Sequence, residues 1–207
     1  MKQTNRLNRI SAVLTAVALL LLLPVAVAAE SPAETAVTPQ TVYVSSGGND
    51  ATAAVGDKTK PYADFLTAYG QLTATGGTVV LLDDVTIDLN GVSKTGDAVR
   101  IYLPKSDRPI AVCGMYHEDT QAYSALCLAN GIAGVCFELE GDVTFYDMIF
   151  RVRFAQNLFF AANGYALTFG FHITNETESG RFANIIGGIQ HAAAKVPQNP
   201  NGGATVT

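Results

Sequence analysis

The sequence predicts an all-β fold, a β-solenoid with one helix capping its N-terminal end. Beyond residue 77 the chain is a succession of short apolar or alternating segments, separated by Gly and Asn residues that suit tight turns. One earlier segment has helical periodicity, and the later ones include no helix long enough to cross over a flat parallel sheet. Two later segments also align with each other at an offset of 24 residues, a period that suits one turn of a solenoid.

Residues 1–29 are predicted to be a signal peptide. Lys2, Arg6 and Arg9 precede the unbroken apolar segment "ISAVLTAVALLLLLPVAVAA", which ends in small residues. This segment is also about long enough to span a bilayer, so an uncleaved membrane anchor is the alternative. The helix-breaking Pro24 just before the Ala-rich end favours cleavage. We therefore expect a secreted or cell-surface protein.

The charge of the chain argues against nucleic acid as a partner. The full sequence has 13 basic and 18 acidic residues, for a net charge of -5. Because three of the basic residues lie in the leader, the cleaved chain carries 10 basic residues against 18 acidic ones, a net charge of -8. Such a chain repels phosphate backbones and anionic lipid. We expect no nucleic-acid partner, and a membrane contact only through an uncleaved leader.

Two short segments precede the predicted solenoid. Residues 30–40 are Pro-containing and polar, which predicts a flexible lead-in. Residues 41–77 are predicted to form a strand ("TVYVSS"), a polar loop and the capping helix, with Pro61 as the first helical residue. The helix ends at "TGG", where Gly76 or Gly77 can adopt a positive φ. The apolar face of this helix consists of Tyr62, Phe65, Leu66, Tyr69 and Leu72.

Residues 78–207 are predicted to be the turns of the solenoid. The predicted strands are "TVVLL", "VTIDL", "AVRIYL", "PIAVCG", "VCFELEG", "DVTFYDMIFRVRF", "NLFFAAN", "YALTFGFHI" and "NIIGG". The final "QNPNGGATVT" has the pattern of a corner followed by the start of another strand. We therefore expect the solenoid to be incomplete at its C-terminal end, since natural repeat proteins cover such an open end with a cap.

Self-similarity supports the solenoid. The segments "LEGDVTFYDMIF" and "ANGYALTFGFHI" align at the offset of 24, and a looser match places "FEL" of residues 137–139 over "FFA" of residues 159–161, one residue out of register. The inward parity changes near residues 146–148, which predicts a bend there. A β-sandwich remains the alternative, because alternating β sequence aligns with itself easily. The offset pairs Val143 with Leu167, Thr144 with Thr168, Phe145 with Phe169 and Ile149 with Ile173.

The stretch "TVYVSSGGND...KPYADFLTAYGQLTATGGTVVLLDDVTI" resembles the N-terminal part of right-handed parallel β-helix proteins of the pectate-lyase-like type. "GDVTFYDMIF" followed by "NGYALTFG" is similar to coils of exported bacterial β-helix proteins of unknown role. The resemblance covers about residues 41–188 and implies a right-handed parallel β-helix whose helix plugs the open end. It implies little about activity, since no catalytic motif of that family can be placed on this sequence.

Three carboxylates in the first predicted turn are candidate metal ligands. Asp83, Asp84 and Asp88 could hold calcium together with backbone carbonyls. The sequence lacks the Asp-x-Asp-x-Asp-Gly pattern of a calcium loop, which favours solvated corner residues. A polar loop is likewise the favoured interpretation of "YHEDT" at residues 116–120, because adjacent side chains splay apart. We expect no cofactor, with calcium as the alternative.

Four charged residues are the candidates for catalysis. Alternation places Arg151 and Arg153 of "FRVRF", and Glu138 and Glu140 of "CFELE", on outward faces. Enzymes of the resembled family combine calcium-binding carboxylates with an Arg or Lys base, and β-helix glycosidases use paired carboxylates. These four residues could meet across neighbouring strands, but cross-strand ion pairs on a solvated surface are the favoured interpretation.

The cysteine count does not predict a disulfide scaffold. Cys113, Cys127 and Cys136 are an odd number in an exported chain, so at most one bridge can form within it. Their spacing matches no zinc site. We expect buried free thiols that act as small apolar residues.

Two functions remain open from the sequence. The favoured one is a non-catalytic extracellular or cell-surface β-helix segment of a larger exported protein, which contacts polysaccharide or cell-surface components. The leader, the acidic charge and the repeats favour it. The alternative is a polysaccharide lyase or glycoside hydrolase of the pectate-lyase-like class.

Overall fold

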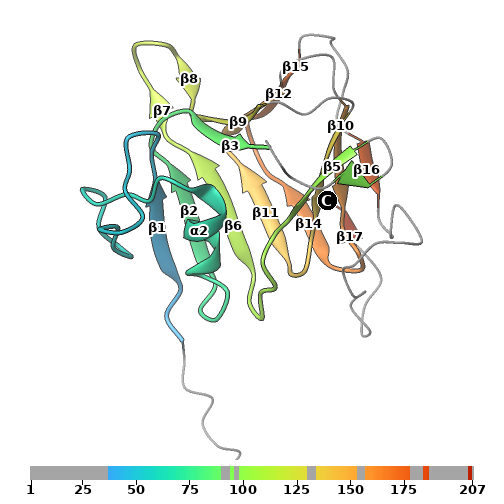
Figure 1. Cartoon of the computed structure of the whole chain (residues 1–207), viewed down its shortest axis with the longest axis horizontal. Coiled ribbons are helices and arrows are strands. Elements are labelled where there is room, and N and C mark those ends of the chain that lie inside the picture. Colours follow the sequence, from blue (N-terminus) through green and yellow to red (C-terminus); the bar gives the residue numbers. More distant parts are fainter. Residues whose placement is uncertain are drawn as a thin grey trace, which may run out of the picture. The chain divides into compact units, whose positions relative to one another are not determined.

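The computed structural model describes residues 37–89, 94–95, 98–129, 134–152, 157–177, 184–186 and 205–206. They belong to the second of the two units into which the chain divides, Met1–Ala36 and Val37–Thr207. The predicted signal peptide, most of the lead-in and Arg153 lie outside the described residues. Across the described part of the chain nearly all regular structure is β-strand, and α2 (Phe65–Gly70) is the one helix (Figure 1). The all-β prediction is therefore confirmed.

Most strands lie in three sheets, named A, B and C here. Sheet A has the order β1 (Gln40–Val44), β2 (Gly77–Leu81), β6 (Ile110–Gly114), β11 (Val143–Tyr146), β14 (Ala166–Phe169) and β17 (Thr205–Val206). Sheet B has the order β3 (Val85–Asp88), β9 (Ala125–Ala129), β12 (Met148–Val152) and β15 (Ile173–Thr177). Sheet C has the order β4 (Lys94–Thr95), β5 (Ala98–Tyr102), β10 (Gly134–Glu138), β13 (Asn157–Ala161) and β16 (Asn184–Ile186). A separate hairpin consists of β7 (Tyr116–His117) and β8 (Ala122–Tyr123).

After β1, successive strands visit sheets A, B and C in turn. Repeat 1 is β2, β3 and β5; repeat 2 is β6, β9 and β10; repeat 3 is β11, β12 and β13; and repeat 4 is β14, β15 and β16. Strands of one sheet pair in parallel between successive repeats, and only β4 pairs antiparallel within the three sheets as described. The alternative left open by the sequence was a β-sandwich. Its face-to-face antiparallel layers do not give parallel pairing between successive repeats.

The register confirms the predicted period up to one corner. β11 and β14 pair Val143 with Leu167, Thr144 with Thr168 and Phe145 with Phe169, at the offset of 24. Beyond the corner the structure pairs Met148, not Ile149, with Ile173, so the prediction for Ile149 was wrong by one residue. The physical reason is that the corner of repeat 4 is longer than the corner of repeat 3. The looser match is also shifted by one, because β10 and β13 pair Phe137 with Phe160.

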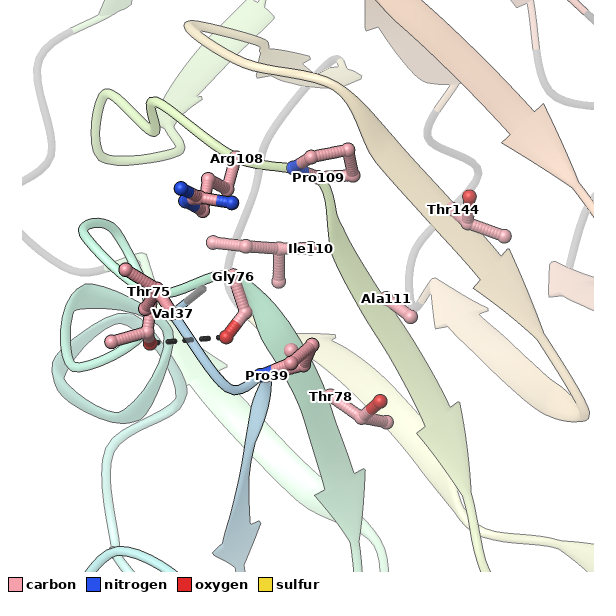
Figure 2. Close-up of a pocket in the computed structure, with 11 residues that line it drawn as sticks. Val37, Pro39, Thr75, Gly76, Thr78, Arg108, Pro109, Ile110, Ala111 and Thr144 are labelled. Atoms are coloured by element: carbon pink, nitrogen blue, oxygen red, sulfur yellow. Dashed lines mark hydrogen bonds between the residues drawn. The ribbon is translucent and has the colours of Figure 1, made fainter. Parts of the chain in front are cut away.

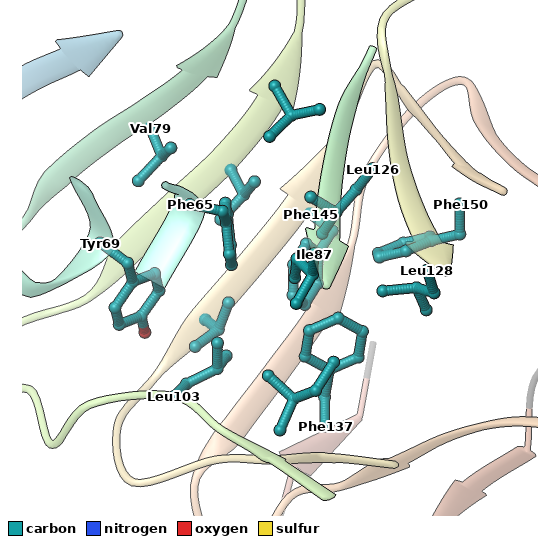
Figure 3. Packing of buried hydrophobic residues seen from close by; sticks show 14 of the residues in the cluster. Phe65, Tyr69, Val79, Ile87, Leu103, Leu126, Leu128, Phe137, Phe145 and Phe150 are labelled. Carbon is teal, nitrogen blue, oxygen red and sulfur yellow. The ribbon is translucent and has the colours of Figure 1, made fainter. Parts of the chain in front are cut away.

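Inward-facing side chains of all three sheets form one apolar core (Figure 3). Val79 comes from sheet A, Leu126 from sheet B and Phe137 from sheet C, and each is fully buried. The pairing stacks like side chains: Phe137 lies on Phe160 with ring centroids 5.4 Å apart, and the Phe145 ring stacks on Phe169 at 5.9 Å. Complete burial of one such phenylalanine ring contributes about 1.5–3 kcal/mol to the stability of the fold.

The helix begins later than the sequence predicts. Pro61 is not its first residue, because Tyr62 is extended and forms a parallel bridge with Val44. The helix begins after Asp64, whose side chain accepts a hydrogen bond from the Thr67 backbone N–H at 2.6 Å. Its buried face packs on the core, as predicted. The chain then turns at Gly76 (φ 67°) and Gly77 (φ 136°), so both glycines adopt a positive φ.

Among the described residues no helix has the length and apolar character needed to cross a membrane.

Candidate functional site

The corner from sheet A to sheet B differs between repeats. In repeat 3 a single residue, Asp147, separates β11 from β12. In repeats 1 and 4 the same corner takes three residues each, 82–84 and 170–172, and in repeat 2 it takes residues 115–124, which include the β7–β8 hairpin. One residue is therefore enough to make the turn. The corners of repeats 1 and 4 are slightly longer than that, and the corner of repeat 2 is much longer. Loops on a rigid scaffold are the common place for binding residues.

The added residues bring aromatic rings together across repeats 2 and 4. We call Tyr116, Tyr123, Phe171, His172 and the adjoining Asp147 the aromatic corner. Tyr116 meets Tyr123 edge to face with ring centroids 5.1 Å apart. Tyr123 stacks on His172 at 5.6 Å and an interplanar angle of 23°, and the Phe171 and His172 centroids are 6.4 Å apart. The four rings thus form a continuous series.

Much of the aromatic corner faces solvent. Phe171 is 83% exposed and Tyr116 is 43% exposed, whereas the core phenylalanines are fully buried. An exposed ring contributes little to folding, because its burial free energy is not gained. A contiguous exposed aromatic surface instead indicates contact with a ligand or partner.

Polar groups fix the aromatic corner in place. Asp147 and His172 occupy equivalent corner positions with φ of 49° and 53°, a region that non-Gly residues rarely adopt. His172 Nδ1 lies 2.8 Å from Asp147 Oδ1, and because a carboxylate only accepts, Nδ1 donates. The Asp147 N–H donates to the Phe171 carbonyl at 2.8 Å. At the base of the hairpin, His117 Nε2 lies 2.8 Å from Ser124 Oγ.

The electrostatic effect of Asp147 extends to the neighbouring phenol. Partial desolvation raises the pKa of the Tyr123 hydroxyl, and the negative charges of Asp147 and of ionised Tyr116 raise it further. Tyr123 therefore stays a neutral hydroxyl that can donate and accept hydrogen bonds.

The candidate catalytic carboxylate Glu138 is not on a solvated face. Its side chain points away from the core as its alternation predicts, but it is 0% exposed. It pairs with Arg100, which is 1% exposed, and accepts a hydrogen bond from Asn163 Nδ2 at 2.9 Å. The partner Arg100 lies on β5, the neighbouring strand of sheet C. Glu140 is half-buried in the turn after β10.

Arg151 lies on a different sheet and does not meet Glu138. It is on β12 of sheet B, where its Nε donates to Glu176 at 2.8 Å and its guanidinium also pairs with Asp84. The hydrogen bond to Glu176 is the main cause that raises the pKa of Arg151. Arg151 therefore forms cross-strand ion pairs with partners that the sequence did not identify, and these link β12 to β15 of repeat 4 and to the corner of repeat 1. Arg153 lies outside the described residues.

The three candidate calcium ligands have separate partners. Asp83 accepts hydrogen bonds from Ser45 Oγ at 2.6 Å and from the Ser46 N–H at 2.7 Å. Asp84 accepts from the Ala125 N–H at 2.8 Å and pairs with Arg151, a cation in the place where calcium would have to bind. Asp88 ends β3 and lines a cleft of about 470 Å³ between α2 and β5. In the described part of the chain no three His, Cys, Asp or Glu side chains group as metal ligands. Asp83 and Asp84 are thus engaged by groups of the chain itself.

The three thiols are free and buried, as predicted. Desolvation raises the pKa of Cys136 to about 11, and the same cause raises the pKa of Cys113. Because the thiolate is the reactive species, neither cysteine is a suitable nucleophile at neutral pH.

A groove of about 370 Å³ lies on the outer face of sheet A (Figure 2). Its floor is the in-register row Thr78, Ala111 and Thr144, and Pro39 and Arg108 stand at its sides. It offers hydroxyls and one guanidinium, and its lining contains no carboxylate for acid–base chemistry.

No family model, curated protein or solved structure matches this chain. The resemblance to pectate-lyase-like proteins therefore remains a prediction. The aromatic corner was not predicted from the sequence, because residues 116–120 were interpreted as a polar loop. The sequence alignment at the offset of 24 continued through this corner to Ile149 over Ile173, and only the strand pairing shows the shift by one residue after Phe145.

Proposed function

We propose that this chain is a non-catalytic module of an exported protein, a right-handed parallel β-helix that contacts polysaccharide at the cell surface through the aromatic corner. The observation that carries the proposal is the exposed series of aromatic rings at one corner of repeats 2 and 4, whereas the same corner of repeats 1 and 3, residues 82–84 and Asp147, carries no aromatic residue. The apolar face of a pyranose ring stacks on Tyr and Phe, and phenol, imidazole and carboxylate groups beside it bind the sugar hydroxyls.

The strand order supports the β-helix. Strands visit three sheets in turn and pair in parallel between repeats, which is the arrangement of a chain wound around one axis. Connections between parallel strands of one sheet are right-handed in nearly all proteins, so we assign that hand here. Export rests on the predicted signal peptide.

The engagement of charged side chains supports a non-catalytic role. Glu138 is buried against Arg100, and Arg151 is held between Asp84 and Glu176. A general acid or base must reach substrate with a free proton site. Both groups are instead paired with opposite charges of the chain itself.

The test is polysaccharide binding by the exported chain, measured by affinity electrophoresis through gels that contain neutral, basic and acidic polysaccharides. Replacing both Tyr116 and Phe171 by Ala is expected to weaken binding about tenfold or more, since stacking contacts contribute about 0.5–1.5 kcal/mol each. Tyr102→Ala is the matched control, because Tyr102 has a similar exposure to Tyr116 but lies on sheet C.

Two results would contradict the proposal. One is retention by none of the polysaccharides, or an equal loss in the Tyr102→Ala control. The other is release of reducing or unsaturated oligosaccharides by the chain alone, which would make it an enzyme.

A further inference from the structure

The charged residues in the segments that form the aromatic corner are all acidic. The inserted segments, residues 115–124 and 170–172, together with Asp147 contain Glu118, Asp119 and Asp147 but no Lys or Arg. Lys58 lies at the base of the hairpin, where its Nζ is 3.4 Å from Met115 Sδ. A ligand on these rings therefore meets a negative field, which favours cationic groups and repels carboxylates.

Asp147 is in direct contact with one of the rings, that of His172. Its backbone is held at both ends: its N–H donates to Phe171, and its carbonyl accepts from the Gly114 N–H at 2.9 Å. Its side chain is 32% exposed, and Oδ1 is engaged by His172. Oδ2 is then left for a ligand, a fixed acceptor beside the stacked rings of His172 and Tyr123.

We infer that the aromatic corner selects polysaccharides of amino sugars with unsubstituted amines. The inference rests on the proposed function and names the ligand class of the same site. A protonated hexosamine combines an apolar ring face, which stacks on Tyr or Phe, with an ammonium group that pairs with a carboxylate and is attracted to aromatic faces. The N-acetylated sugar keeps the ring face and loses the charge. A uronic acid places a negative charge against Asp147.

The experiment compares three soluble probes by calorimetry at neutral pH: oligomers of β-1,4-linked glucosamine, their N-acetylated equivalents and oligogalacturonate. The exported chain is expected to bind the glucosamine oligomers about tenfold more tightly than the N-acetylated ones, and oligogalacturonate least. Added salt should weaken glucosamine binding and leave the N-acetylated oligomers nearly unaffected.

The variant that isolates the charge is Asp147→Asn, because Asn tolerates the left-handed backbone and keeps the side-chain shape. The readout is the ratio of its affinities for the glucosamine and N-acetylated oligomers, which should fall to near unity whatever the change in either affinity alone. Asp88→Asn removes the same charge far from the rings, at the end of β3, and should leave the preference unchanged.

The outcomes separate this inference from the proposed function. Equal affinity for the glucosamine and N-acetylated oligomers, or a preference that survives in Asp147→Asn, overturns the inference and leaves polysaccharide contact standing. Tightest binding of oligogalacturonate also overturns it. Binding of none of the probes, nor of any polysaccharide in the electrophoresis panel, removes the proposed function as well.

Discussion

Glu138 and Arg100 form a buried ion pair on the outer face of sheet C. Moving two charges out of water costs several kcal/mol each, and the cost is recovered only when both have good partners. Glu138 has Arg100 and Asn163 as partners, so its charge is stabilised by direct contacts rather than by water. The pair therefore adds little net stability, but the loss of one partner removes the opposite charge that offsets the burial of the other.

Glu138→Gln is expected to lower the free energy of unfolding by about 3–5 kcal/mol, because it removes the negative charge that faces the buried Arg100 guanidinium. The double variant Arg100→Met with Glu138→Leu removes both charges and should recover most of the loss. Arg151→Met breaks a partly exposed pair and should cost only about 0–1 kcal/mol. Urea denaturation followed by circular dichroism measures all three. A Glu138→Gln loss no larger than that of Arg151→Met would show that the pair is solvated.

At the scale of elements, the first repeat depends on how closely β1 approaches the start of β2. A Cβ on Gly77 would lie 1.9 Å from the Gln40 carbonyl oxygen, and the φ of Gly77 is 136°. No side chain fits there. Gly70, the last residue of α2, has open space in the direction of a Cβ.

Gly77→Ala is expected to separate β1 from β2 and to cost at least about 2 kcal/mol, from backbone strain and lost strand pairing. The measurement is hydrogen exchange, in which residues 40–44 should lose protection. Gly70→Ala is the control and should be neutral or stabilising by about 0.5–1 kcal/mol. Retained protection of β1 in Gly77→Ala would mean that the close approach is not required.

Strand positions were predictable where one face is apolar and the other polar, as in β3 and β11. Strand β9 was missed because its outward residues Ala125 and Cys127 are also buried, beside Ile149, so its sequence does not alternate. Alternation gave the correct side for Glu138 but not its burial, since that depends on Arg100, which is distant in the sequence. The aromatic corner depends on the register between repeats, which a single sequence fixes only approximately.

At the scale of the described molecule, the repeats and the insertions have separate roles. Stacking in register builds a core in which each inward position continues from one repeat to the next, as Val112, Phe145 and Phe169 do in sheet A. Such a scaffold tolerates additions at its corners, because the strands on both sides are fixed by their neighbours. This explains how a hairpin and an extra Phe171 coexist with unbroken pairing of sheets A and B.

The central claim is that repeats pair in parallel with the register of Thr144 opposite Thr168, and an engineered disulfide tests it most directly. Neighbouring strands lie about 4.8 Å apart, so Thr144→Cys with Thr168→Cys, in a chain whose native cysteines are replaced by Ala, is within the Cα separation of about 4.4–6.8 Å that a disulfide requires. We predict nearly complete cross-linking of this pair by mass spectrometry after mild oxidation, and little for the control pair Thr144→Cys with Ala166→Cys, which is displaced by two residues. Absence of the 144–168 bridge, or an equal yield in the control, would contradict the parallel register.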